Sequence, residues 1–512
     1  MLAKRLTRWC VAPLVALATA GWAGEQSPKR RTFETLIVEI DLASLIEESL
    51  AVSPDSRHIA YATTVPLPGG SGLTMAAVVD WKAGKTYDAI GKSGFAFSPD
   101  SRHVAYSAYR GDTCFVVVDG KEGKPYDGAH AGIWRFSPDS RHLAYVVKKD
   151  KELFVVVDGK PGKPFDNITE GSPIFSPDSR RVAYVGVTGG KWHMVVDGKE
   201  GKPYDGIAHE PSLFSPDSRH VAYVAQTNKK WVVVVDGEES KPYDGIGQGT
   251  PVFTPDGRHV AFHAKTDKKQ MAVIDGKEHK KYIFVNDVAF TPDGRHIVYT
   301  AWDGNGWMVV VDGKEGARYR GISESGVIFS PDSQHMAYSA HRGGGWFVVT
   351  DGKQGPLCDG IGTRSLVFSP DSQHVAYQAA VGDERTVVVD GKPGKQYDGI
   401  GLGCPVFSPD SRHVAYAAQV GDKWLTVLDG KEGKRYDSIG TRRFFQFSAD
   451  SQHLVYMARV GDKWVVVING TEGKPFDHAV EGSSIVFDAP NRLHYLAVTE
   501  GSVVYLVEEV FD

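Results

Sequence analysis

The sequence predicts an all-β protein made of about twelve copies of one four-stranded unit. An element like FSPDSRHVAY recurs along the chain, most often every 39 residues. Between the copies lie short runs rich in valine, tyrosine and tryptophan, which favour strands, and no stretch shows the apolar spacing of a helix. The serine or threonine of the eleven legible copies stands at Ser53, Ser98, Ser137, Ser176, Ser215, Thr254, Thr291, Ser330, Ser369, Ser408 and Ser448. A degenerate twelfth copy, VFDAPNRLHYLAV, begins near Phe487.

Each unit is predicted to contain four strands joined by tight turns. PVFSP is typical of the first strand. The Pro-Asp-Ser or Pro-Asp-Gly that follows forms a turn, because proline fixes φ and aspartate can bond its own backbone. RHVAYVA is the second strand and KWVVVVD the third. Asp-Gly then opens a hairpin into KPYDGI, which we expect to be the fourth strand.

The third strand is apolar on both faces, and this property predicts the architecture. A sheet of about 40 residues cannot cover both faces of such a strand by itself. Radial stacking supplies the cover, because each sheet then packs between two neighbours. The sequence therefore predicts a β-propeller in which each unit is one blade.

The FSPDSRHVAY element resembles the propeller repeat of the TolB type, also called WD-like. Blades of that family begin with a strand, a Ser-Pro-Asp-Gly turn and an apolar second strand. The resemblance extends from Val52 to the C-terminus and implies the fold, but it says little about function. TolB itself also has an N-terminal α/β domain, and the segment between Gly24 and Val52 is too short to form one.

The repeat spacing favours two six-bladed propellers in tandem, residues 33–280 and 281–512. Propellers commonly have four to eight blades, and the shortest spacing follows the sixth unit, where KPYDGI is replaced by KKYIFVND. We expect 36–40 to be the outer strand of blade six and 282–285 that of blade twelve. The alternative is one large ring closed by the N-terminal strand in blade twelve. That ring would place Ile37 beside Tyr505, whereas two rings would place it beside Val273.

Residues 1–23 are predicted to be a secretory signal peptide. Basic residues precede an apolar run, 10–23, which is too short to span a bilayer and ends in small residues. We expect cleavage after Ala20 or Ala23, with an uncleaved anchor as the alternative. No later stretch is apolar enough to span a membrane, so the predicted location is periplasmic or secreted.

The loops of the predicted blades differ in how strongly they vary. The Ser-Pro-Asp-Ser turns and the hairpins between third and fourth strands share one face and are nearly uniform. The hairpins between second and third strands, and the connections between blades, share the other face and vary from unit to unit. We call this second face the variable face and expect it to bind a partner. The candidate binding residues are Trp302, Trp307, Trp346, Arg110, Arg342, Arg364, Arg442 and Arg443.

The sequence does not favour a metal site, a nucleophilic serine, a phosphate-binding loop or a nucleic-acid partner. One histidine per unit places these side chains around a ring and not in one coordination sphere, so no metal site is predicted. The chain has no G-x-S-x-G nucleophile motif, and its GKS triplet at 91–93 lacks the glycine and the helix of a phosphate-binding loop. The net charge of −5 argues against a nucleic-acid partner. No cofactor is expected.

These observations favour an exported, non-catalytic scaffold that binds a protein or peptide partner of the cell envelope through its variable face. One alternative is a propeller enzyme, a polysaccharide lyase or glycosidase with its site in the central channel. Trp134, Arg135, Arg364 and the pair Arg442 and Arg443 depart from the repeat on inner strands and would suit that enzyme. A further alternative is a sensor of carbohydrate or another small ligand.

Overall fold

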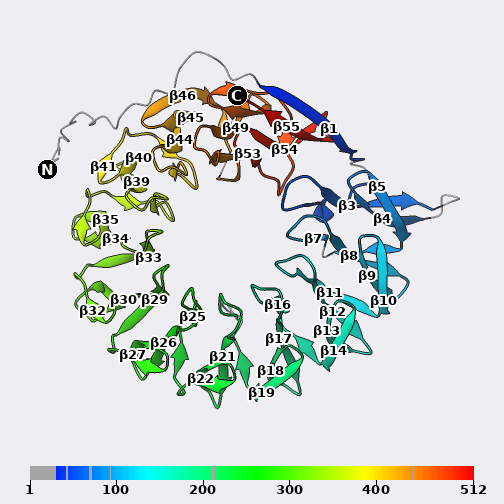
Figure 1. Cartoon of the computed structure of the whole chain (residues 1–512), viewed down its shortest axis with the longest axis horizontal. Coiled ribbons are helices and arrows are strands. Elements are labelled where there is room, and N and C mark those ends of the chain that lie inside the picture. The colour runs from blue at the N-terminus through cyan, green and yellow to red at the C-terminus, as the bar shows by residue number, and fades with distance from the viewer. Residues whose placement is uncertain (1–29, 42–43, 68–71, 93, 209–213, 441) are drawn as a thin grey trace, which may run out of the picture.

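The computed structural model describes residues 30–512 apart from 42–43, 68–71, 93, 209–213 and 441. The predicted signal peptide lies outside these residues. The chain forms twelve antiparallel sheets, and these sheets stand as blades in one ring around a common axis (Figure 1). Among the described residues, no helix reaches the length and hydrophobicity needed to cross a bilayer.

The second and third strands form the centre of each blade and pair along most of their length. The second strands are β3 (Ile59–Pro66), β8 (Val104–Arg110), β12 (Leu143–Lys149), β17 (Val182–Thr188), β21 (Ala222–Thr227), β26 (Val260–Thr266), β30 (Ile297–Trp302), β34 (Met336–Arg342), β39 (Val375–Val381), β44 (Val414–Val420), β49 (Leu454–Val460) and β54 (Arg492–Thr499). The third strands are β4 (Leu73–Val79), β9 (Thr113–Val118), β13 (Glu152–Val157), β18 (Lys191–Val196), β22 (Lys230–Val235), β27 (Lys269–Ile274), β31 (Trp307–Val311), β35 (Gly345–Thr350), β40 (Glu384–Val389), β45 (Lys423–Leu428), β50 (Lys463–Ile468) and β55 (Val503–Val510).

The inner and outer strands vary in length from two to nine residues. The inner strands are β2 (Ala51–Val52), β6 (Ala89–Ile90) with β7 (Ala96–Phe97), β11 (Gly128–Phe136), β15 (Asn167–Ile168) with β16 (Ile174–Phe175), β20 (Gly206–Ile207), β24 (Gly245–Ile246) with β25 (Val252–Phe253), β29 (Phe284–Phe290), β33 (Gly321–Phe329), β37 (Gly360–Ile361) with β38 (Val367–Phe368), β42 (Gly399–Ile400) with β43 (Val406–Phe407), β47 (Ser438–Ile439) with β48 (Phe445–Phe447), and β52 (His478–Ala479) with β53 (Val486–Ala489). The outer strands are β5 (Lys82–Tyr87), β10 (Lys121–Tyr126), β14 (Lys160–Phe165), β19 (Lys199–Tyr204), β23 (Glu238–Glu239), β28 (Lys277–Glu278), β32 (Lys314–Glu315), β36 (Lys353–Gln354), β41 (Lys392–Pro393), β46 (Lys431–Tyr436), β51 (Thr471–Glu472) and β1 (Arg31–Glu39). Two short 3-10 turns are η1 (Glu47–Ser49) and η2 (Arg442–Phe444).

The segment KPYDGI is divided between two blades, which differs from the single fourth strand expected. In the copy at 241–246, Tyr243 pairs with Trp231 at the outer edge of blade five. Gly245 and Ile246 pair instead with β26 and begin the inner strand of blade six. The division arises because the backbone of Gly-Ile completes the ladder of the next blade, so the chain crosses between blades at the intervening aspartate.

The N-terminal strand β1 closes the ring by pairing with β55 as the outer strand of blade twelve. In Figure 1 the blue strand lies beside the red one. Leu36 lies opposite Tyr505, with a register shift at the next residue. The alternative of one large ring is therefore confirmed, and the expectation of two six-bladed rings is wrong.

Blade six shows why the two-ring closure fails. Its own outer strand, β28, pairs with β27, and Tyr282 continues that edge by pairing with Gln270. No edge position is left there for residues 36–40. Residues 284–290 form the inner strand of blade seven and do not complete blade twelve.

In most blades the repeated Ser-Pro-Asp-Ser turn forms a hydrogen bond to the next blade. Ser98 Oγ donates to Asp100 Oδ1 at 2.6 Å and accepts the His103 amide at 3.0 Å. The Asp100 amide then donates to Ser140 Oγ of the following blade at 2.9 Å. The same interblade bond joins Asp55 to Ser101, Asp139 to Ser179, Asp178 to Ser218, Asp293 to Ser333, Asp332 to Ser372, Asp371 to Ser411 and Asp410 to Ser451. Construction of the ring thus accounts for the uniformity of this turn.

The apolar third strands lie buried between neighbouring blades, as their sequences predict. In one core cluster, Val387 of blade nine, Val427 of blade ten and Val467 of blade eleven are each at most 2% exposed. Burying an aliphatic side chain of this size contributes about 1.5–3 kcal/mol. Packing between blades is therefore the main source of stability of the ring.

A buried ion pair anchors the beginning of β1 in blade twelve. Arg30 pairs with Glu509, and their side chains are 9% and 0% exposed. Arg30 Nη1 also donates to the carbonyls of Val466 at 3.1 Å and Thr471 at 3.2 Å. The Tyr495 hydroxyl donates to Glu509 Oε1 at 2.8 Å, and burial, together with this carboxylate, raises the pKa of Tyr495 well above its ordinary value.

We predict that Glu509→Gln destabilises the protein by about 3 kcal/mol, because the substitution leaves the Arg30 charge buried without its counterion. The measurement is the shift of the urea unfolding midpoint. Lys474→Met is the matched control, since the exposed pair of Lys474 with Glu34 should contribute about 1 kcal/mol or less. Equal effects of the two substitutions would contradict a role for the buried pair in ring closure.

Candidate functional site

Among the described residues, only blade seven carries an aromatic ladder. Phe284 begins β29 and lies opposite Trp302, the last residue of β30. Trp302 lies opposite Trp307, and Trp307 pairs with Tyr319 of the outer edge. The position of Phe284 is held by glycine in the inner strands of blades three, five, six, eight, nine and ten. We define the aromatic ladder as Phe284, Trp302, Trp307 and Tyr319.

The rings of the ladder stack on one face of the blade. The centroids of Phe284 and Trp302 are 5.6 Å apart with an interplanar angle of 26°, and those of Phe284 and Trp307 are 6.4 Å apart at 22°. Phe284 is 45% exposed, the two tryptophans are half-buried, and Tyr319 is buried. The ladder therefore presents flat aromatic surface to solvent at its inner end.

The hairpin between β30 and β31, beside the ladder, is capped by a different residue from the one that caps this hairpin in most blades. In nine blades an aspartate that follows the outer strand caps this hairpin, as Asp88 does by accepting the Gly111 amide at 2.7 Å. In blade seven this position is Ile283. Asp303, within the hairpin, accepts the Asn305 amide at 2.9 Å and the Arg318 guanidinium instead. The Asn305 amide and Arg318 lower the pKa of Asp303, which keeps a carboxylate and a cation at the edge of the ladder.

Two further predicted residues lie in the adjacent blade. Arg342, at the end of β34, places its guanidinium 5.4 Å from the ring centroid of Tyr319 and is exposed. Trp346, at the start of β35, contacts His341 with ring centroids 5.2 Å apart. The structure therefore brings four of the eight predicted residues into two neighbouring blades. We define the aromatic surface as Phe284, Trp302, Trp307, Arg342 and Trp346.

The other predicted arginines lie elsewhere in the ring. Arg364 is exposed at a φ of 57°, between β37 and β38 of blade nine. Arg442 and Arg443 lie in η2 of blade eleven, and Arg443 Nη1 donates to the Gly482 carbonyl at 3.5 Å. Arg110 donates to Glu122 at 2.6 Å and covers the Tyr87 ring at 4.8 Å. None of these four belongs to the aromatic surface.

Sequence reasoning missed Phe284, although a signal for it was present. Considered from the sequence alone, the change from YDGI to YIFV around this residue favours a ring boundary. The structure shows that the same change builds the aromatic ladder and removes the usual hairpin cap. The departure from the repeat marks blade seven as different from the others. It reflects the aromatic ladder, however, and not a ring boundary.

The repeated histidines bond within their own blades. His103 Nδ1 lies 2.8 Å from Asp119 Oδ2, and equivalent pairs occur in most blades. Each pair joins the start of the second strand to the hairpin after the third strand. Among the described residues, no group of three side chains could hold a metal ion.

Outer strands of neighbouring blades are joined by a repeated polar contact, which we call the outer tie. The Tyr87 hydroxyl and Lys85 Nζ of blade one reach Glu122 of blade two at 2.9 and 3.2 Å. Arg110, the largest influence, and Tyr87 lower the pKa of Glu122 to about 2. Equivalent lysine–glutamate pairs are Lys163–Glu200, Lys202–Glu239, Lys241–Glu278, Lys280–Glu315, Lys395–Glu432, Lys434–Glu472 and Lys474–Glu34.

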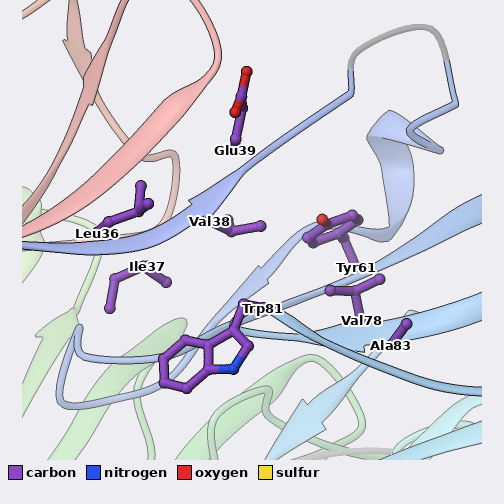
Figure 2. Close-up of a pocket in the computed structure, with 8 residues that line it drawn as sticks. All are labelled: Leu36, Ile37, Val38, Glu39, Tyr61, Val78, Trp81 and Ala83. Atoms are coloured by element: carbon purple, nitrogen blue, oxygen red, sulfur yellow. The ribbon is translucent and has the colours of Figure 1, made fainter.

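The junction of blades twelve and one has an apolar pocket where the outer tie would lie. In the register of the sheets, Val38 of β1 takes the position of the tyrosine and Ala83 of β5 that of the glutamate. A pocket of about 380 Å³ remains. Its lining residues are Leu36, Ile37, Val38, Glu39, Tyr61, Val78, Trp81 and Ala83 (Figure 2). We call this space the junction pocket.

The fold and its repeats define a class: the protein is a β-propeller with a WD40-type repeat. The family model described as WD domain, G-beta repeat, matches residues 269–306. This segment runs from β27 of blade six to the hairpin of blade seven and includes Phe284 and Trp302. No curated protein matches the chain.

Similar solved structures include propellers of several kinds. A eukaryotic initiation factor is 14% identical with a TM-score of 0.35, covering 66% of this chain and 96% of its own. TolB from Acinetobacter baumannii is 17% identical with a TM-score of 0.24, covering 50% and 77%. The propeller domain of the Trilobed protease from Pyrococcus furiosus is 14% identical with a TM-score of 0.23, covering 64% and 97%. These likenesses carry no information on function.

A carboxyl group on the inner strand of blade seven has an unusual environment. Asp287 is exposed at its surface, but neighbouring atoms remove part of the water around its carboxyl group. This desolvation is the main cause that raises the pKa of Asp287, and the charge of Glu324 acts in the same direction. The Thr300 hydroxyl donates to Asp287 Oδ2 at 3.1 Å, which opposes the shift. Ionised Asp287 therefore lowers the stability of the folded state.

We predict that Asp287→Asn raises the melting temperature at pH 7. A carboxyl whose pKa is raised by folding favours the fold below its unfolded pKa and loses that contribution as the pH rises through its folded pKa. Asparagine keeps an acceptor for Thr300 and tolerates the φ of 55° at this position. Thermal unfolding at several pH values measures the effect, and the gain should vanish near pH 3. A gain that is independent of pH would contradict the assignment.

Proposed function

We propose that this protein is an exported, non-catalytic scaffold that binds a protein or peptide partner of the cell envelope through the aromatic surface. The observation that carries the proposal is the aromatic ladder, in which Phe284 replaces a glycine of the repeat and stays 45% exposed. We assign the repeat to the TolB type from its FSPDSRHVAY elements. Export rests on the signal-like sequence of residues 1–23.

The composition of the surface supports a peptide ligand. The exposed Phe284 ring and the half-buried tryptophan rings provide rigid contact area at low entropic cost, and aromatic rings are enriched where proteins bind each other. Arg318 and Arg342 flank the ladder and can donate to carboxylates or backbone carbonyls of a ligand. A segment with apolar or aromatic side chains next to acidic ones fits this arrangement.

Construction of the ring does not require the ladder. Blade five has Gly206, Gln226 and Trp231 at the positions of Phe284, Trp302 and Trp307, and forms the same sheet. Exposed aromatic surface is unfavourable in water. A binding role explains why blade seven retains it.

We predict that Phe284→Gly with Trp302→Gln abolishes partner binding without loss of the fold, because it gives blade seven the residues of blade five. Affinity capture from the envelope fraction, followed by titration of the captured partner, measures the change. Loss of this much aromatic contact should weaken binding at least about 30-fold.

Trp231→Ala in blade five is the matched control and should leave binding unchanged. Equal binding by the parent and the double variant would overturn the proposal. Capture of a polysaccharide in place of a protein, lost in the same variant, would also overturn it and favour the carbohydrate sensor.

An enzyme acting on polysaccharide is the second candidate, and Asp287 is the observation that favours it. Its raised pKa and the neighbouring Glu324 resemble the carboxyl environments used in general acid catalysis. Turnover of a polysaccharide that is lost in Asp287→Asn, with a melting temperature no lower than that of the parent, would support this candidate over the scaffold.

A further inference from the structure

Strand β1 has one edge without a partner. It stands at the end of its sheet, in the order β1, β55, β54 and β52, so only β55 pairs with it among the described residues. Its first six residues, 31–36, are exposed. With nine residues it is also the longest outer strand in the ring.

The other outer strands carry features that prevent pairing with another chain. β10, β14 and β19 each contain a lysine-flanked glycine and a proline, in KEGKPY or KPGKPF, and their register shifts at the glycine. Short strands, irregular register, proline and lysine are the devices that protect sheet edges. The sequence of β1, RTFETLIVE, has neither glycine nor proline. Its register is regular from Arg31 to Leu36 and shifts once, between Leu36 and Val38.

Apolar side chains are exposed along this edge. Phe33 is 53% exposed and Leu36 is 52% exposed. Trp81, which lines the junction pocket beside Leu36, is 65% exposed. Figure 2 shows Trp81 next to the part of β1 that carries Leu36, Ile37 and Val38. A long edge with exposed apolar residues is a site for association with a further strand.

We propose that β1 pairs with β1 of a second copy of this chain, antiparallel and about a twofold axis near Thr35. The opposite charges at the two ends of β1 indicate that its binding partner is a second copy of the same strand. Arg31 at one end of the strand and Glu39 at the other are exposed, and neither makes an ion pair with another described residue. Antiparallel pairing brings Arg31 of each copy to Glu39 of the other.

The same arrangement covers the exposed apolar residues. Phe33 and Leu36 lie within two positions of the twofold centre, so both copies contribute them to the middle of the contact. A twofold contact uses the same patch on both partners and is closed, which prevents extended fibres. Because one pair of nine-residue strands forms a small interface, we expect a dimer that dissociates in about the micromolar range.

Sedimentation equilibrium of the purified protein from about 1 to 100 µM tests the proposal, since this range spans the expected dissociation constant. The expected result is an increase of mass to twice that of the monomer. Phe33→Lys with Leu36→Lys should shift the association at least about 30-fold, because the substitution removes the apolar side chains from the middle of the contact and brings four lysines close to the axis. Both side chains are more than half exposed, so the melting temperature should change little.

Leu357→Lys is the matched control, because Leu357 is a 49% exposed residue near the outer edge of blade eight. It should leave the dimer intact. A monomer at all concentrations would overturn the proposal, and so would a dimer that survives the double lysine substitution. Loss of the dimer in the Leu357 variant would place the contact elsewhere and also overturn it.

Charge reversal tests the pairing of the strand with its own copy. Arg31→Glu or Glu39→Arg alone should weaken association about fivefold, because each places like charges opposite one another at both ends of the contact. The double variant should recover the parent affinity. Failure to recover, with both single variants weakened, would overturn antiparallel pairing of β1 with β1.

Discussion

The ring depends on the burial of both faces of the third strand in every blade. Such a strand is stable only between two neighbouring sheets, so each blade needs a blade on either side. An open row would leave an apolar face uncovered at each end. Closure by β1 removes both ends at once, because blade twelve receives its outer strand from the N-terminus and packs against blade one. The N-terminal strand is therefore the element that turns a row of repeats into a closed structure.

The blades could be predicted from sequence, but the number of blades in a ring could not. Strand order, the Pro-Asp turn and the Asp-Gly hairpin depend on residues close together in the chain, and the sequence shows them directly. Ring size depends on a small rotation between neighbouring blades, and that rotation is set by packing across each junction. No single motif encodes it. The preference for six blades rested on what is common among propellers, whereas the pairing of Leu36 with Tyr505 decides for twelve.

The candidate site could likewise be predicted from the sequence only in part. Trp302, Trp307, Arg342 and Trp346 could be identified from the sequence because they lie in or beside the variable hairpins of an otherwise uniform repeat. It could not show that the first two stack with Phe284, because that contact requires the inner strand to pair with the second strand of its own blade. The same limit applies to Arg110. Only the structure shows that its guanidinium lies between Tyr87 and Glu122 at a blade junction.

Departures from the repeat are informative here because uniform junctions suffice to build the ring. Twelve similar sheets need similar contacts, and the interblade serine bond and the outer tie recur to supply them. A blade that loses a standard contact must replace it, as Asp303 does for the missing hairpin cap of blade seven. At the closing junction the outer tie is absent, and Val38 and Ala83 leave an apolar pocket in its place. Blade seven and the closing junction are thus two places where a repeated contact is missing and apolar surface is exposed. Exposed apolar surface is unfavourable for folding alone, which makes these two places candidates for binding.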